Sequence, residues 1–200
     1  MVPDPSRLAR AGVVIPIRAF AVGKARLADT LDPAPRAELA EWMADQVLAA
    51  AGSLPVVVVS SADDVRAWGE RHQVTVIDDA GDLDRAAAAG VAWCAGRGLV
   101  RAIVAHADLP HAPVGGLVRF ASDDAQPIVT IVPCHRDDGT PVIAVPVATP
   151  FSFAYGSGSF RRHISVAHQR GLAVRVVRDP QLGFDVDVPS DLATLTATAP

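Results

Sequence analysis

Residues 101–110, with the sequence RAIVAHADLP, decide how the rest of the chain is interpreted. Residues 101–105 predict a strand, and Asp108 follows shortly before Pro110 turns the chain. We therefore expect the Asp108 carboxylate at the carboxyl end of a sheet, the edge at which open α/β sheets bind ligands. A carboxylate there suits Mg²⁺, which takes one or two carboxylates together with phosphate oxygens. In the alternative interpretation, Asp108 caps a helix that begins near Pro113.

Apolar runs and helical patterns alternate on both sides of this segment. Strands are expected at residues 13–17, 55–60, 74–77, 101–105, 127–133, 142–147 and 172–177. Helices are expected at residues 35–51, 62–71, 83–97, 113–121 and 159–170, with a terminal helix from Ser190. Strands 127–133 and 142–147 could be antiparallel, joined by the polar loop CHRDDGTP. The alternation predicts an α/β fold of three layers, α/β/α, on a mostly parallel open sheet, with residues 1–200 as a single domain.

Composition excludes several classes of protein. The 200 residues are 50% hydrophobic with a net charge of −4, which argues against disorder and against binding to nucleic acid or an anionic membrane. No apolar run approaches the roughly 20 residues of a membrane span, and residues 1–12 lack the apolar core of a signal peptide. Cys94 and Cys134 have no CxxC partner, so we expect two reduced, buried thiols and a cytoplasmic protein.

A basic loop follows the first expected strand. Residues 18–27 read RAFAVGKARL, in which Gly23 gives the backbone freedom and Lys24 and Arg26 supply positive charge. Such a loop at a strand end can hold a phosphate chain, with lysine as a point charge and arginine as a planar fork. The segment matches neither a P-loop nor GxGxxG, so a solvated basic loop is the alternative.

A second acidic segment lies near the C-terminus. In residues 184–189, FDVDVP, an extended backbone would place Asp185 and Asp187 on the same face. Two neighbouring carboxylates resist joint ionisation unless a cation neutralises them. One of them could instead cap the terminal helix, a role for which Ser190 and Asp191 compete. Together with Asp108 and the basic loop, this segment suggests a divalent metal bound to a phosphorylated ligand.

Smaller features surround this centre. Residues 155–159, YGSGS, lead into a helix, so their amides and Ser159 could bind an anion, or form a flexible turn that ends in a serine cap. Gly139 and Thr140 could add an amide and a hydroxyl to the same ligand. His106 and His111 flank Asp108 and are interpreted as supporting or surface residues rather than as a catalytic base.

The motifs occur in an order that resembles the 2-phospho-L-lactate guanylyltransferase family of coenzyme F-420 biosynthesis, some of whose bacterial members use phosphoenolpyruvate. The shared motifs are KARL after VVIPIR, then ADLP, DDGT, YGSGSFRRH and RDPQLGFDVDVPSDL. The resemblance covers nearly the whole chain and implies a glycosyltransferase-A-like nucleotidyltransferase fold. It also implies GTP and a small phosphorylated carboxylic acid as substrates and Mg²⁺ as cofactor. The sequence itself does not fix the oligomeric state, for which a homodimer is one possibility.

Site roles follow from the resemblance. It assigns metal ligation to Asp108, Asp185 and Asp187, substrate binding to Arg18, Thr140, Gly156 and Ser159, and the nucleotide triphosphate to Lys24 and Arg26. This chain departs from the family where Asp84 replaces a common asparagine, Pro141 replaces another, and Arg18 replaces a frequent lysine. Asp84 and Pro141 leave base selectivity and acceptor identity open. The alternatives are a related nucleotidyltransferase with another acceptor or base, and an inactive nucleotide-binding domain.

Overall fold

A seven-stranded sheet forms the centre of the protein, seen in a computed structural model that describes residues 10–78, 81–122 and 127–198. Its strands run in the order β3-β2-β1-β4-β6-β5-β7. Their bounds are β1 Ala11–Pro16, β2 Val56–Val59, β3 Thr75–Ile77, β4 Arg101–Ala105, β5 Ile128–Val132, β6 Val142–Pro146 and β7 Ala173–Val176. Residues 1–9, which carry most of the segment interpreted as lacking a signal peptide, lie outside the described residues.

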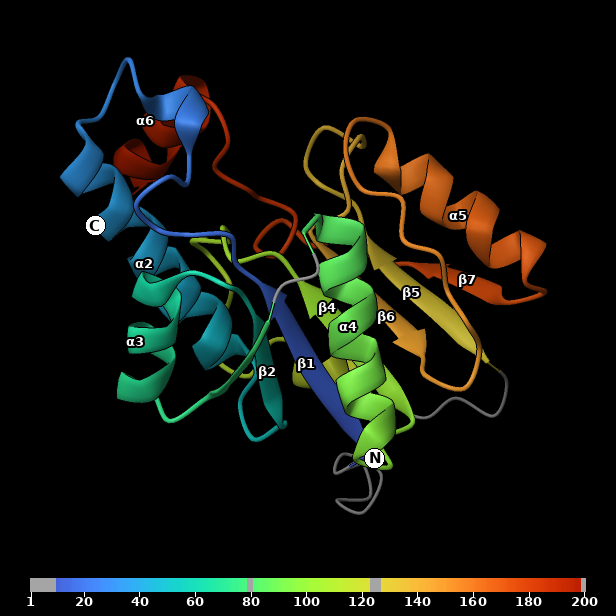
Figure 1. Ribbon diagram of the computed structural model, residues 1–200. Coiled ribbons are helices and arrows are strands. Elements are labelled where there is room, and N and C mark those ends of the chain that lie inside the picture. Colours follow the sequence, from blue (N-terminus) through green and yellow to red (C-terminus); the bar gives the residue numbers. More distant parts are fainter. Residues whose placement is uncertain (1–9, 79–80, 123–126, 199–200) are drawn as a thin grey trace.

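Strand β6 is the antiparallel member of the sheet. It pairs in antiparallel fashion with β4, where Ile103 lies opposite Ala144, and with β5, where Ile131 lies opposite Ile143. The pairs β1–β2, β1–β4, β2–β3 and β5–β7 are parallel. The predicted antiparallel pair and mostly parallel sheet are therefore confirmed. The carboxyl ends of β1, β4 and β5 and the start of β6 meet at the upper edge in Figure 1.

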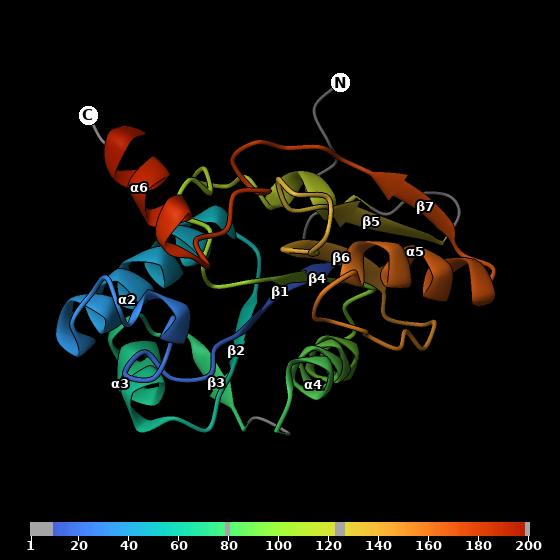
Figure 2. The ribbon, with the colours of Figure 1, turned by 90° about the horizontal axis from the view of Figure 1, so that it is seen from above.

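Helices cover both faces of the sheet (Figures 1 and 2). Helices α2 (Pro33–Ala50) and α3 (Asp63–Arg71) pack on one face, whereas α4 (Leu83–Gly96) and α5 (Ser159–Gln169) pack on the other. Helix α6 (Pro189–Thr198) lies beside α2, joined to it by a small apolar cluster of Leu27, Met43, Val186 and Leu195. The three-layer α/β/α architecture is the one that the alternation predicts.

The apolar run of β1 lacks alternation because both of its faces are buried. Val13 and Ile15 belong to the core under α2 and α3, and Val14 belongs to the core under α4. Helix α4 approaches this strand so closely that a Cβ on Gly90 would lie 2.0 Å from Val14 Cγ1. Glycine at this position therefore sets the distance between helix and sheet.

Residues 113–121 differ from their prediction as a short helix. They form turns followed by a single 3₁₀ turn, η2 (Val118–Phe120). Gly115 has a φ of 68°, which an α-helix cannot include, and its amide donates to Ala49 O at 3.0 Å. Bonding to the end of α2 thus replaces helical bonding within the segment.

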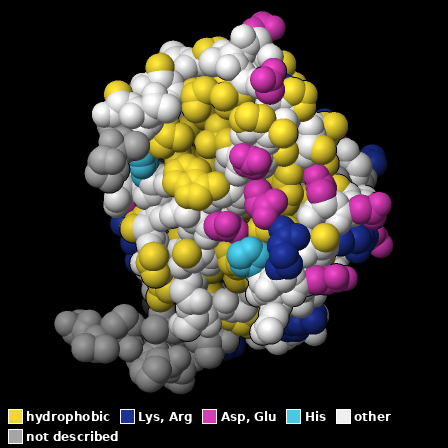
Figure 3. Space-filling view, turned by 90° about the vertical axis from the view of Figure 1, so that its left-hand side faces the viewer, with side chains coloured by type: hydrophobic (Ala, Val, Ile, Leu, Met, Phe, Trp, Pro, Cys, Tyr) yellow, Lys and Arg dark blue, Asp and Glu magenta, His cyan; other side chains and the backbone are white. Residues whose placement is uncertain are grey.

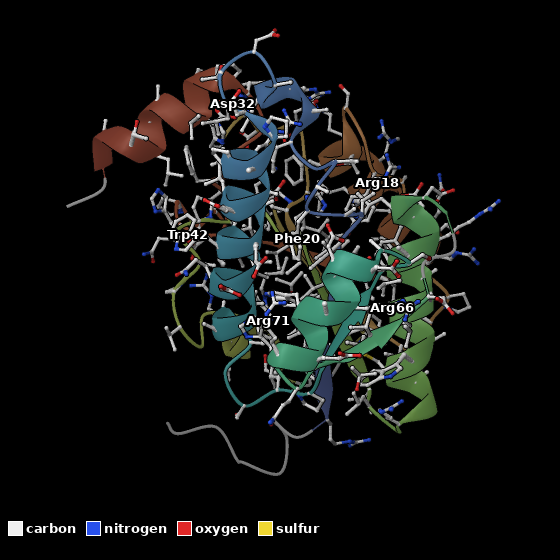
Figure 4. The ribbon with its side chains drawn as sticks, turned by 60° about the vertical axis from the view of Figure 1, so that its left-hand side comes forward. Arg18, Phe20, Asp32, Trp42, Arg66 and Arg71 are labelled. Atoms are coloured by element: carbon white, nitrogen blue, oxygen red, sulfur yellow. The ribbon has the colours of Figure 1, made fainter. Side chains whose placement is uncertain are left out.

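The face that carries α2 and α3 is mixed in polarity. Hydrophobic side chains gather in its upper half, and charged side chains of both signs lie together below them (Figure 3). Arg71 of α3 pairs with Glu41 of α2 at 2.6 Å, and Trp42 lies on the side of α2 away from α3 (Figure 4). Both cysteines are buried and unpaired, as predicted. Among the described residues, every helix falls short of what a membrane span requires.

Candidate active site

Three loops meet at the carboxyl edge of the sheet. They are residues 17–24 after β1, residues 106–110 after β4, and residues 183–188 before α6. The Val186 amide donates to Asp108 O at 3.3 Å, and the His106 amide donates to Pro141 O at 2.8 Å. The bond between Val186 and Asp108 brings the two acidic segments together, although Asp185 follows Asp108 by 77 positions along the chain.

 

Lys24 joins the two acidic segments. Its Nζ atom lies 2.5 Å from Asp108 Oδ2 and 3.2 Å from Asp187 Oδ1, and its side chain is 10% exposed. The residue precedes the 3₁₀ turn η1 (Ala25–Leu27) and has a φ of 56° and ψ of 39°, left-handed values that residues other than glycine rarely adopt. Backbone strain of this kind is held in place by its surroundings and concentrates at functional sites.

We call Lys24, Asp108, Asp185 and Asp187 the carboxylate cluster, and their charges shift one another's pKa values. Burial opposes ionisation of Asp108, but the neighbouring Lys24 ammonium holds its pKa below the usual range. The two carboxylates in turn overcome the burial of Lys24 and raise its pKa. Asp185 has no ammonium beside it, although His135 Nδ1 lies 3.4 Å from its Oδ1; burial, together with the charges of Asp108 and Asp187, raises its pKa. Three carboxylates therefore share a single ammonium.

The donor set of this cluster fits a divalent cation. Asp108 Oδ1 and Asp185 Oδ1 are buried and accept no hydrogen bond from the described residues. Each of these oxygens has a histidine nitrogen nearby, His106 Nδ1 at 4.0 Å from Asp108 Oδ1 and His135 Nδ1 at 3.4 Å from Asp185 Oδ1. Buried carboxylate oxygens normally accept hydrogen bonds, so these two are suited to a positive ligand. No three metal-binding side chains of the described residues already converge on one point, and the Lys24 ammonium stands between Asp108 and Asp187.

Asp191 holds the Asp187 segment in place. Its Oδ2 atom accepts from the amides of Asp187 at 2.9 Å and Val188 at 3.0 Å, while its own amide donates to Val188 O. The bond from the Val188 amide to the Asp191 carboxylate is the half of a capping box in which the third helical residue accepts from the amide of the cap residue. Of the candidates for that cap, Asp191 takes the role and leaves Asp185 and Asp187 available to the cluster. Arg136 binds the other oxygen of Asp191.

A pocket of about 330 Å³ opens beside Lys24. Arg18, Lys24, His106 and Asp108 contribute polar side chains to it, and its apolar walls include Ile17, Phe20, Met43, Val59, Leu83 and Ala86. Arg18 lies near the start of α4, and Phe20 lies in the interior between α2 and α3 (Figure 4). An apolar pocket with a few convergent charges is the usual form of a small-molecule site. Arg26 is peripheral: it is 75% exposed and 4.0 Å from Asp187 Oδ2.

Thr140 and Ser159 lie together in a second group. Their hydroxyl oxygens are 3.4 Å apart, and His163 Nδ1 lies 3.0 Å from Thr140 Oγ1. We call Thr140, Ser159 and His163 the hydroxyl cluster. Sequence reasoning overlooked His163, although its position four residues after Ser159 places the two on one face of a helix. Burial, with the charges of His106 and Arg162, lowers the pKa of His163 to about 4.

The loop before α5 is tightly braced rather than a flexible turn. The Arg162 guanidinium donates to the carbonyls of Ala154, Tyr155 and Ser157, and the amide of Gly158 donates to Asp138 Oδ1 at 2.8 Å. The cap residue of α5 is Gly158, not the serine of the alternative interpretation. Gly156, with a φ of 96°, is exposed within this loop.

Asp84 and Pro141, two of the three departures from the family pattern, have structural roles. Asp84 Oδ1 accepts from the Tyr155 amide at 2.7 Å, so this carboxylate ties the start of α4 to the loop before α5. Asp84 does not line the pocket beside Lys24, whereas its neighbour Leu83 does. Pro141 presents its carbonyl to the His106 amide and so fixes the segment that leads to Asp108.

Comparison with known proteins identifies relatives that match nearly the whole chain. The family described as "Guanylyl transferase CofC like" matches residues 11–198. The chain is 34% identical to a phosphoenolpyruvate guanylyltransferase of Rubrobacter xylanophilus, covering 92% of this chain and 93% of that protein. It is 30% identical to a 2-phospho-L-lactate guanylyltransferase of Methanothermobacter thermautotrophicus, covering 91% and 82%.

The fold is shared with nucleotidyltransferases. A Desulfovibrio desulfuricans structure described as a nucleotide-diphospho-sugar transferase superposes with a TM-score of 0.77 at 17% identity, covering 94% of this chain and 86% of that one. Such a likeness concerns architecture alone, and it confirms the predicted fold. The family matches nearly the whole chain, and the two relatives are 34% and 30% identical to it, so this chain belongs to the CofC-like guanylyl transferase family.

Proposed function

We propose that this protein transfers GMP from GTP to the phosphate of a small phosphorylated carboxylic acid, phosphoenolpyruvate or 2-phospho-L-lactate, and releases pyrophosphate. The reaction would serve the biosynthesis of coenzyme F-420. The observation that carries the proposal is the carboxylate cluster, in which Lys24 joins Asp108 and Asp187 at the mouth of the pocket. The names of the relatives support the same donor and the same class of acceptor.

The reaction needs little covalent help from the protein. A phosphate oxygen of the acid attacks the α-phosphorus of GTP, the bond from that phosphorus to the β-bridging oxygen breaks, and its electron pair leaves with pyrophosphate. Because a phosphate monoester is anionic near neutral pH, no strong general base is required. Positioning and charge neutralisation then account for catalysis.

The chain's own cations can oppose the repulsion between the two anionic substrates. Lys24 is buried at the pocket and would bind the triphosphate, and Arg18, on the same pocket, would bind the nucleotide or the acid. Arg26 is exposed and would act at longer range on the triphosphate. The apolar walls would hold the base and exclude water from the reacting phosphates.

Asp108, Asp185 and Asp187 would hold Mg²⁺. When bound, the ion would neutralise charge on the phosphates and help to align them. The two unpartnered carboxylate oxygens of Asp108 and Asp185 support this assignment. The Thr140, Gly156 and Ser159 region would take the phosphate or carboxylate of the acid.

The test is a reaction with GTP, Mg²⁺ and one acid at a time, chosen from phosphoenolpyruvate, 2-phospho-L-lactate and phosphoglycerate. Pyrophosphate release and the mass of the guanylylated acid are measured together. Turnover with one of the first two acids supports the proposal. Turnover with CTP, ATP or UTP in place of GTP would indicate a nucleotidyltransferase of other base selectivity, and tight GTP binding without turnover for every acid would indicate a binding domain.

A further inference from the structure

His163 is held in one tautomer. The Ala154 amide donates to His163 Nε2 at 3.0 Å, and an amide can only donate, so Nε2 carries the lone pair. In the neutral ring the proton is then on Nδ1, which faces Thr140 Oγ1 at 3.0 Å. The rings of Phe151, Phe153 and Tyr155 surround the imidazole at centroid distances of 5.9, 6.2 and 4.9 Å.

Burial and the neighbouring positive charges keep the His163 ring neutral. His163 is fully buried, and the nearby charges of His106 and Arg162 act in the same direction as burial, so its pKa lies far below neutral pH. A neutral ring with Nε2 occupied by the Ala154 amide has a single donor, Nδ1–H. His163 therefore donates to Thr140 and does not accept from it.

Because His163 donates to Thr140, the hydroxyls of Thr140 and Ser159 keep their own hydrogens for other bonds. Thr140 and Ser159 each have one hydroxyl hydrogen. Ser159 donates to Thr140 at 3.4 Å, and rotation of both hydroxyls reverses this bond, so that Thr140 donates to Ser159 and the Ser159 hydrogen is free. Since His163 supplies its own hydrogen to Thr140, the second hydroxyl hydrogen is left over, and the hydrogen bonds of the described residues leave it unassigned. With the other tautomer, Nδ1 would accept and would consume that hydrogen.

A leftover donor in a buried position favours an anionic oxygen as its partner, because an unpaired buried donor is costly. Thr140 and His163 are 0% exposed and Ser159 is 2% exposed, so the cluster is buried and Ser159 is its most accessible member. The Ser159 amide donates to the carbonyl of the exposed Gly156 at 3.0 Å.

We propose that His163 is a positioning residue for the acid substrate: by donating to Thr140, it directs one hydroxyl hydrogen of the Thr140–Ser159 pair, through Ser159, to an anionic oxygen of that acid. The inference rests on the proposed function and deepens it. The hydroxyl cluster accordingly recognises an oxygen anion and rejects groups that can only donate.

Two variants separate the bonds of His163. The amide of Asn takes the place of Nδ1, so His163→Asn can still donate to Thr140 but loses the bond to Ala154. The amide of Gln takes the place of Nε2, so His163→Gln keeps the bond to Ala154 but loses the donor to Thr140. We expect the KM for phosphoenolpyruvate to rise about tenfold in His163→Gln and most of that rise to be recovered in His163→Asn. The KM for GTP should change little in both.

A double variant tests whether His163 acts through Thr140. Thr140→Val should raise the KM for phosphoenolpyruvate, and adding His163→Gln to it should raise that KM no further. Nitrogen NMR of the wild-type imidazole should show Nδ1 protonated and Nε2 unprotonated. Thermal unfolding of each variant records how much of its change is loss of folding.

The outcomes are distinct. If the wild type shows no turnover and no calorimetric binding of phosphoenolpyruvate or 2-phospho-L-lactate, the proposed function and this inference both fail. If the wild type turns over but the Gln and Asn variants have equal KM values, if the effects of Thr140→Val and His163→Gln multiply, or if Nε2 carries the proton, the positioning role alone is overturned.

Discussion

The carboxylate cluster and the hydroxyl cluster lie at the same edge of the sheet, but the first is charged and the second is neutral. The first contains three carboxylates, two of which bind the Lys24 ammonium. Two of its buried carboxylate oxygens accept no hydrogen bond from the described residues. The second is neutral, and each of its three side chains has a hydrogen-bond partner. Both are assembled from distant segments by backbone hydrogen bonds.

The two clusters therefore differ in their effect on the stability of the folded protein. Buried charge with incomplete hydrogen bonding destabilises the folded protein, so the carboxylate cluster lowers stability until ligands complete it. A neutral network in which each side chain has a hydrogen-bond partner costs less to bury than unpaired charge, and it holds its groups in one orientation. We therefore expect variants of the first cluster to affect catalysis and metal binding, and variants of the second to affect stability and the KM of the acid.

The largest effect is expected for Asp108→Asn. The amide removes one negative charge from the residues that would hold Mg²⁺ against the phosphates, and turnover should fall about 10²–10³-fold, the range for removing one group that helps to stabilise developing charge. The swap relieves charge crowding around Asp185 but takes a partner from the buried Lys24, so the melting temperature should fall. Turnover close to wild type at saturating Mg²⁺ would contradict the assignment of Asp108.

The hydroxyl cluster should make the protein sensitive to acid. His163 has a pKa of about 4 in the folded protein and an ordinary value of 6.5, so the unfolded chain binds more protons in this window. The stability that His163 contributes is complete above pH 6.5 and is lost as the pH falls towards 4. The free energy of unfolding should drop by up to about 3 kcal/mol over this range.

The measurement is urea unfolding at several pH values for the wild type and for His163→Gln. Other groups titrate in both proteins, so the difference between the two curves isolates His163. The stability gap between wild type and variant should narrow as the pH falls from 6.5 to 4. A gap that stays constant across this window would contradict a neutral His163.

Lys24→Met should have opposite effects on GTP turnover and on metal binding in the carboxylate cluster. Without the ammonium, kcat/KM for GTP should fall about 10²-fold. Binding of Mn²⁺ to the nucleotide-free protein, followed by electron paramagnetic resonance, should tighten, because Lys24 no longer stands between Asp108 and Asp187. The matched control is Arg26→Met, which removes the same charge from an exposed position and should change both quantities much less. Equal effects of the two variants would contradict a special role for Lys24.

The sequence predicts those features that depend on alternation and on the ends of strands. The unalternated apolar run of β1 indicates a strand covered on both faces, and the position of Asp108 directly after β4 places it at the ligand edge. Lys24 and the 185–187 segment reach the same edge because they also lie at the boundaries of elements. Residue type and local position are sufficient for these inferences.

The remaining features depend on long-range contacts that local patterns do not specify. The left-handed backbone of Lys24 is held by bonds to two carboxylates from other parts of the chain. The tautomer of His163 depends on the Ala154 amide, which belongs to the loop before α5 and donates to the ring. The turns at residues 113–121 follow from bonding to the end of α2, which outweighs their local tendency to form a helix.

The smallest effect concerns the support of the carboxylate cluster. Asp191→Ala removes the cap of α6 and the bonds that fix the amide of Asp187, so the free energy of unfolding should fall by about 1–2 kcal/mol. Turnover should fall less than in Asp108→Asn, because Asp187 keeps its charge. Ser190→Ala is the matched control: Ser190 is exposed in the same turn, and its loss should change stability by less than about 0.5 kcal/mol. If Ser190→Ala is as destabilising as Asp191→Ala, the capping box is not what anchors this segment, and the carboxylate cluster must be held by the bond between Val186 and Asp108 instead.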